Sequence, residues 1–167
     1  AVAINFLSAK LGFVIVGILA ALFPFIVMTG MHHALTPIGL NAIATGGSDT
    51  LIFVSQVCSN LAQSGSSFAV AVKSKDSNMK QLASAAAVSA LMGITEPALY
   101  GVTLKLKRPV VAASVAAGIG GIVGGLFQVS LYIAQNCIMA IPAFIGDKGM
   151  SNLLYGIIMI IVSFVAS

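Results

Sequence analysis

The chain has 167 residues, of which 59% are hydrophobic and 7% are charged, with a mean hydropathy of +1.07 and a formal net charge of +4. Ordinary globular domains contain about 25% charged residues, so this composition excludes a soluble domain. The basic residues are too few and too segregated to form a nucleic-acid-binding face. We therefore expect an all-α integral membrane protein.

Four long runs lack Asp, Glu, Lys and Arg, and each exceeds the ~18 apolar residues expected of a bilayer span. These runs cover residues 11–48, 50–72, 109–146 and 149–167. They predict a polytopic helical transporter domain with spans over about 11–29, 50–72, 109–130 and 149–167. The polar residues and the "GDKGMSN" turn indicate a second irregular element over 131–148.

Seven of the eight basic residues can be placed on one side of the membrane, and cytoplasmic loops carry the excess of Lys and Arg. They are Lys10, Lys73, Lys75, Lys80, Lys105, Lys107 and Arg108. With Lys10 inside, the first span runs outward and the second returns to "KSKDSNMK". The segment between Lys80 and Lys105 is basic at both ends, which favours a re-entrant hairpin over 81–104 rather than a single crossing.

The tip of this hairpin is predicted at "GITEP". Gly93 loosens the backbone, while Pro97 removes a donor and disfavours helical geometry at Glu96. Non-helical backbone at membrane depth persists where it is buried in protein or lines a watery cavity. Pro97 also suits the first turn of a second arm. The tip should therefore face a cavity inside the protein.

Glu96 is the only glutamate of the chain and follows Thr95 in otherwise apolar sequence. A charge in hydrocarbon costs about 2.5–3.5 kcal/mol on insertion scales, so an ionisable residue there is a functional candidate. The carboxylate is suited to accepting hydrogen bonds from hydroxyl groups, or to carrying a proton or cation. The structural alternatives are an ion pair or a position in an interfacial loop.

The stretch "PFIVMTGMHHALTPIGLNAIATGG" reads as a broken helix that enters a site. Consecutive helical positions differ by about 100°, so we expect one of His32 and His33 to line the cavity while the other packs or caps. A zinc site would need ligands at spacings such as i, i+4 and further acidic or thiolate partners. We expect no metal and no cofactor.

Three further features have structural interpretations. The run "GIGGIVGGLF" predicts close helix packing. A nucleotide-binding glycine loop is disfavoured, because no strand precedes the run and no Lys-Ser pair follows it. Cys58 and Cys137 lack metal or disulfide spacing and are expected to be buried. Asn60 and Gln63, in "SNLAQSGSSF", either line a cavity or form hydrogen bonds between helices.

The motifs "GITEPALYGVTLKLKRP", "MTGMHHALTPIGLNAI" and "PAFIGDKGMSN" resemble the membrane component, enzyme IIC, of sugar permeases of the bacterial phosphoenolpyruvate-dependent phosphotransferase system. The likeness is to the sucrose, trehalose and β-glucoside branch of the glucose superfamily. It implies that 1–167 is the C-terminal, sugar-binding and transport part of an enzyme IIC domain. The N-terminal part of that domain would then form the scaffold that makes the homodimer. The protein would be a multi-pass protein in the lipid bilayer of the bacterial inner membrane.

The resemblance also implies roles for residues. Glu96 would hydrogen-bond the sugar, His32 corresponds to the family's histidine with His33 beside it, and Gly93 and Thr95 belong to the same loop. The sugar would be released inward as a phosphate ester. Its phosphoryl group would come from a cysteine of a IIB domain, supplied by IIA and HPr. Neither cysteine here matches that motif, so the phosphorylated residue of this sugar phosphotransferase is expected outside this chain.

Two other functions fit the residues. In an ion-coupled secondary transporter, Glu96 would carry a proton or cation, and broken helices near the midplane are common in such proteins. In a packing module of a larger membrane complex, Glu96 would be locked in an ion pair. The identity of the sugar is left open by the sequence.

Overall fold

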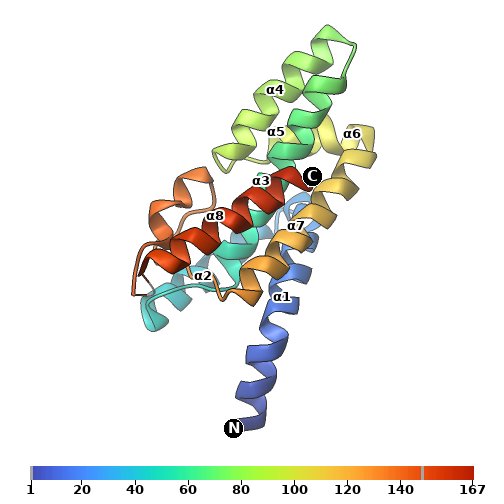
Figure 1. Cartoon of the computed structure of the whole chain (residues 1–167). Helices are drawn as coiled ribbons and strands as arrows, with labels where there is room; N and C mark the ends of the chain where they lie inside the picture. Colours follow the sequence, from blue (N-terminus) through green and yellow to red (C-terminus); the bar gives the residue numbers. More distant parts are fainter. Residues whose placement is uncertain (1, 148) are drawn as a thin grey trace.

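The computed structural model describes residues 2–147 and 149–167, with side chains described from residue 12 onward. Within these residues the backbone is helical, and its one β-type pairing is an isolated bridge between Asp49 and Leu131. Figure 1 shows the arrangement. The elements in chain order are α1 (Val2–Met28), α2 (His32–Gly46), α3 (Ile52–Lys73), α4 (Ser77–Leu91), α5 (Glu96–Ala98), the π-helical turn η1 (Leu99–Thr103), α6 (Leu104–Leu106), α7 (Arg108–Leu126), the 3₁₀ turns η2 (Ile138–Ala140) and η3 (Pro142–Phe144), and α8 (Gly149–Val165).

Helix α3 is the centre of the molecule and packs against α1, α4, α7 and α8. It begins at a capped turn, since the Asp49 carboxylate accepts hydrogen bonds from the backbone N–H groups of Ile52 at 3.2 Å and Phe53 at 2.6 Å, as N-terminal capping side chains do. Protein surrounds α3 on nearly all sides, so most of its residues are buried, and many of these are polar. One of them, Ser64, donates to the carbonyl oxygen of Ala87 in α4 at 2.7 Å.

The glycines of α7 bring two other helices close to it. A Cβ at Gly120 or Gly124 would collide with Ser163 or Met159 of α8. A Cβ at Gly121 or Gly125 would instead collide with α1, around Val16 and Phe13. The two small-residue pairs therefore serve two different neighbours, which confirms the predicted close packing.

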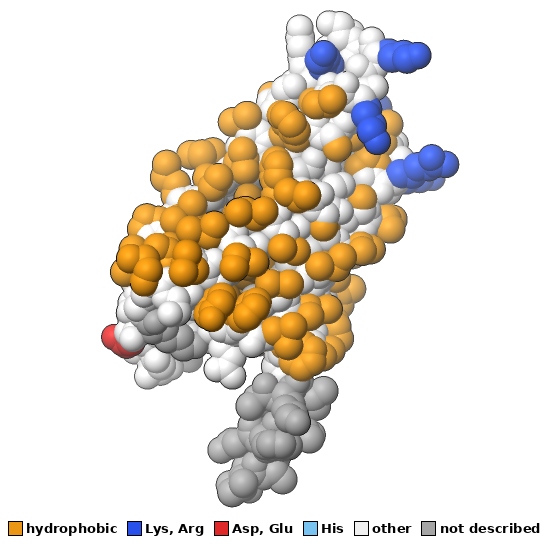
Figure 2. Space-filling view, viewed as in Figure 1, with side chains coloured by type: hydrophobic (Ala, Val, Ile, Leu, Met, Phe, Trp, Pro, Cys, Tyr) orange, Lys and Arg blue, Asp and Glu red, His pale blue; other side chains and the backbone are white. Residues whose placement is uncertain are grey.

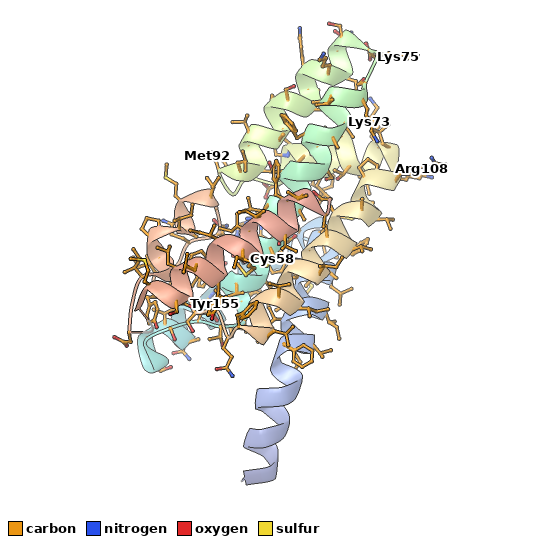
Figure 3. The ribbon with its side chains drawn as sticks, viewed as in Figure 1. Cys58, Lys73, Lys75, Met92, Arg108 and Tyr155 are labelled. Atoms are coloured by element: carbon orange, nitrogen blue, oxygen red, sulfur yellow. The ribbon has the colours of Figure 1, made fainter. Side chains whose placement is uncertain are left out.

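Helix α4 and the second arm, α5–η1–α6, form a helical hairpin. Small side chains of α4, including Ala83 and Ala90, pack against Ala98 and Val102 of the second arm. The chain turns back at residues 92–95 and returns to the end of the molecule that it left after α3. Lys73, Lys75 and Arg108 all lie at this end (Figure 3).

Helices α1 and α2 form another hairpin, which enters from the opposite end of α3. Gly125 and Gly118 of α7 face Phe13 and Ala21 of α1, so these two helices are antiparallel. Helix α1 consequently runs toward the basic end, and the expectation that the first span runs away from it is wrong. That expectation depended on Lys10, whose side chain lies outside the described residues. It also did not include the turn after Met28, where the first uncharged run folds back on itself.

The segment between α7 and α8 is irregular and is organised by one amide. Asn152 of α8 donates to the carbonyl oxygens of Ser130 and Phe144, both at 2.8 Å, and accepts from the backbone N–H of Ser130 at 3.0 Å. These bonds fold residues 130–144 over the end of α8. They also carry Asn136 toward the centre of α3.

The outer surface is strongly apolar. Figure 2 shows hydrophobic side chains over most of the visible face and Lys and Arg side chains gathered at one end. By length and composition, one helix of the described part, Arg108–Leu126, could cross a membrane. Gly12–Met28 and Gly149–Val165 are apolar but shorter.

Replacing Asn152 with Ala should destabilise the protein by about 2–4 kcal/mol, because it leaves the buried backbone groups of Ser130 and Phe144 without partners. Thermal or denaturant unfolding of the purified membrane protein measures this change. Ser151→Ala at the neighbouring exposed position is the matched control and should have little effect. Equal stability of the two variants would contradict this role for Asn152.

Candidate functional site

A cavity of about 310 Å³ lies beside α3, where the tips of the two hairpins meet. It is open on one side and combines polar groups with a few apolar side chains. Its lining residues come from α1, α2, α3, the turn that opens the second arm and the segment before α8. They are Phe23, Val27, His32, His33, Thr36, Gln56, Asn60, Gly93, Ile94, Thr95, Glu96 and Asn136.

Each hairpin tip contains a glycine with positive φ. Gly30 has φ +74° in the turn between α1 and α2, and Gly93 has φ +88° in the turn after α4. Glycine adopts this region without the penalty that a Cβ imposes. The second turn also closes its own backbone, since Ser89 Oγ donates to the carbonyl oxygen of Ile94 at 3.0 Å. Both breaks therefore follow from local sequence.

Glu96 and His32 lie next to each other in the lining of the cavity. Glu96 Oε1 lies 3.7 Å from His32 Nε2, and the two side chains are 47% and 18% exposed. This separation is too long for a hydrogen bond. The Nδ1 atom of His32 is buried and has no hydrogen-bond partner among the described residues. The Glu96 carboxylate and His32 Nε2 thus retain hydrogen-bonding capacity that a bound molecule can use, whereas Nδ1 is out of its reach.

His33 also lines the cavity, with its ring centroid 4.0 Å from that of His32. The expectation that only one of the two histidines would line it is wrong. The cavity borders the first turn of α2, which carries both rings. Two side chains that leave this turn in different directions can therefore both border it.

The structure brings all five residues singled out in the sequence to this cavity, namely Gly93, Thr95, Glu96, His32 and His33. Sequence reasoning left Asn60 open and missed Gln56 and Asn136. Gln56 precedes Asn60 by four residues, so both lie on one face of α3. That spacing was the available signal for Gln56. Gln63 lies outside the cavity lining and donates to Ser59 Oγ within α3, at 3.3 Å.

The turn that carries Glu96 rests on Asn136. Asn60 Nδ2 donates to the backbone carbonyl oxygen of Asn136 at 2.5 Å. The side chain of Asn136 then lies against Gly93, where an added Cβ would come within 2.7 Å of Asn136 Oδ1. Helix α3 therefore supports the second tip through Asn136, and Gly93 is required both by its φ and by this contact.

A hydrogen bond also links the two hairpins outside the cavity. Tyr100 Oη, in the second arm, donates to the carbonyl oxygen of Met28 at the end of α1, at 3.3 Å. Apolar contacts accompany it, since Leu99 packs with Phe23 and Val27 of α1. The tip of one hairpin is thus held against the arm of the other.

The lining determines which chemistry the cavity can perform. Its polar groups are one carboxylate, two imidazoles, amides and hydroxyls, and no Lys or Arg is among the described lining residues. Such groups suit an uncharged molecule with several hydroxyls. In the described part of the chain, no group of three His, Cys, Asp or Glu side chains is placed to hold a metal ion.

Gly93→Ala should lower the unfolding temperature, because it adds both a strained φ and a clash with Asn136. Asn136→Gly in the same protein should restore part of the loss by removing the clashing amide. Gly101→Ala, in the same hairpin, is the control, since its Cβ would lie 3.7 Å from Leu82 in ordinary contact. Unfolding measurements that find no rescue would contradict the contact between residues 93 and 136.

Comparisons with known proteins give a consistent result. The family model "Phosphotransferase system, EIIC" matches residues 1–118. The chain is 39% identical over 165 residues to the β-glucoside-specific EIIBCA component of the phosphotransferase system of Bacillus subtilis, covering 98% of this chain and 26% of that protein. It is 47% identical over 117 residues to the arbutin-, cellobiose- and salicin-specific EIIBC component of Escherichia coli, covering 70% and 24%.

A third relative is the sucrose-specific EIIBC component of Staphylococcus xylosus, which is 43% identical over 151 residues, covering 86% of this chain and 31% of that protein. The chain thus spans about a quarter to a third of the length of these curated relatives. No solved structure matches it.

Proposed function

Because the chain belongs to the phosphotransferase system EIIC family, a family of membrane components, we propose that it forms the sugar-binding and transport part of a sugar permease. In this proposal the cavity holds a glucoside or disaccharide, which crosses the bacterial inner membrane and is phosphorylated on the cytoplasmic side. The observation that carries the proposal is the meeting of Glu96 and His32 in an otherwise uncharged polar cavity.

The basic end of the molecule faces the cytoplasm in this proposal. Lys and Arg gather at that end (Figure 2), as the positive-inside bias requires. Helices α3, α7 and α8 then cross the bilayer in a multi-pass arrangement. The hairpin α4–α6 is re-entrant from the cytoplasmic side, and the hairpin tip after α1 approaches from outside. Such placement is tolerated where non-helical backbone lines a cavity within protein.

Sugar binding follows from the hydrogen-bonding capacity of the two tips. An ionised Glu96 accepts hydrogen bonds from sugar hydroxyls, which are charge-assisted and therefore stronger than neutral ones. His32 contacts a further hydroxyl through Nε2, which lies 3.7 Å from Glu96 Oε1 and makes no short hydrogen bond to it. His33 and Thr95 border the same space, and Gly93 allows the turn that presents Glu96.

The coupling reaction takes place outside this chain. The relatives named above combine B and C components, which supports a IIB domain as the phosphoryl donor, with IIA and HPr upstream. The remaining part of the EIIC domain supplies the scaffold and the dimer contact. Cys58 and Cys137 are buried, so neither is the phosphorylated residue in this proposal.

An ion-coupled transporter is the rival, with Glu96 as the carrier of a proton or cation. Family membership favours phosphorylation-coupled transport instead. Uptake assays in vesicles separate the two: accumulation of unmodified sugar driven by a pH gradient, without a phosphoryl donor, would support the rival. Accumulation of sugar phosphate that depends on the donor would support the proposal.

Glu96→Gln should weaken sugar binding by the full-length protein by about one order of magnitude or more, since a charge-assisted hydrogen bond contributes about 1.5–3 kcal/mol. Glu96→Ala should weaken it further. Calorimetric titration with salicin, cellobiose and sucrose measures the change. Asp147→Asn is the control, because Asp147 is exposed and does not line the cavity. Unchanged affinity in both Glu96 variants would remove the proposed role.

A further inference from the structure

We propose that Gln56 is a further specificity-determining residue of the same site and that its amide hydrogen-bonds two neighbouring hydroxyls of the sugar. This proposal rests on the proposed function. It concerns a residue of the rigid helix α3, on a different element from Glu96 and His32, which lie on the hairpin tips. It assigns to α3 a direct part in choosing the substrate.

The burial of Gln56 is the first observation. Its side chain lines the cavity, and the residue is 4% exposed. No hydrogen-bond partner for its amide is found in the part of the chain that the structure describes. The buried side-chain atoms that lack a partner do not include those of the Gln56 amide, so the amide is accessible from the cavity. A ligand in the cavity supplies the missing partners.

The other two amide side chains of α3 make hydrogen bonds within the described part of the protein, whereas that of Gln56 does not. Asn60, one turn further along the same face, uses its Nδ2 to hold the backbone of Asn136. Gln63 donates to Ser59 within the helix and does not line the cavity. Gln56 alone among these three side chains combines a place in the cavity wall with an uncommitted amide.

The chemistry of the site calls for such a group. An ionised carboxylate only accepts hydrogen bonds, whereas an amide side chain both donates and accepts at adjacent atoms. Each sugar hydroxyl can also donate and accept, so an amide can bind two hydroxyls on neighbouring carbons. Glu96 accepts from hydroxyls on one side of the ring, and Gln56 supplies a donor and an acceptor from α3. A site built to bond a hydroxyl strongly disfavours an analogue that lacks it.

The test uses Gln56→Met and its matched control Gln63→Met in the full-length membrane protein. Both substitutions replace a buried amide of α3 by an apolar side chain of similar length, but only the first changes the cavity lining. Titration calorimetry with methyl β-glucoside and its series of monodeoxy analogues gives the affinities. Gln56→Glu, which keeps the size and removes the amide donor, provides the same readout should Gln56→Met fail to fold.

We expect Gln56→Met to weaken binding of the parent glucoside by roughly tenfold or more, and Gln63→Met to leave it unchanged. One or two monodeoxy analogues should bind the unmodified protein weakly, yet lose no further affinity in Gln56→Met. This non-additivity identifies the hydroxyls that the amide contacts. A purely structural role would lower the affinity for every analogue by the same factor.

The outcomes separate this inference from the function on which it rests. If Glu96→Gln weakens binding but Gln56→Met does not, or if all analogues lose affinity equally, the role of Gln56 is wrong and the sugar site stands. If neither Glu96→Gln nor Gln56→Met changes the affinity, the cavity is not the sugar site and both proposals fail.

Discussion

Broken helices inside an apolar bundle must find hydrogen-bond partners within the protein, and the rest of this structure depends on how the two hairpin tips meet that requirement. Around Gly93, the Ser89 hydroxyl closes the turn, and Asn136 lies against the glycine. Asn136 is held in turn by Asn60 of α3. Asn60 and Asn136, which support the break, also border the cavity, so two of the residues that make non-helical backbone tolerable also make the cavity polar.

The two tips come from hairpins that enter from opposite ends of α3, and both contribute ionisable groups to the cavity, Glu96 from one tip and His32 and His33 from the other. The 3.7 Å between Glu96 and His32 is therefore a distance between two separately anchored units. Tyr100 and the contact of Leu99 with α1 hold these units together next to the cavity. A molecule that bonds both Glu96 and His32 favours the arrangement in which the tips are close, because it gains both contacts only there.

Local sequence predicted the features that depend on a few adjacent residues. Gly93 and Pro97 located the second tip, and the spacing of Gly120, Gly121, Gly124 and Gly125 predicted close packing. The direction of α1 could not be obtained this way, since one lysine carried the inference and the fold-back after Met28 produces no charge signal. Asn136 was missed because the bond to Asn60 spans 76 residues of sequence. Both histidines line the cavity, which their spacing in the sequence does not reveal.

Hydropathy alone does not identify α3, a helix whose residues line the cavity. Helix α7 meets the criterion for a span by length and composition, whereas α3 carries Ser, Asn and Gln along most of its length. Its surroundings are protein rather than lipid, so polar side chains there can pair with neighbouring backbone, as Ser64 does with Ala87, or border the cavity, as Gln56 does. The most buried helix is consequently among the least apolar, and its polarity places amide side chains in the cavity wall.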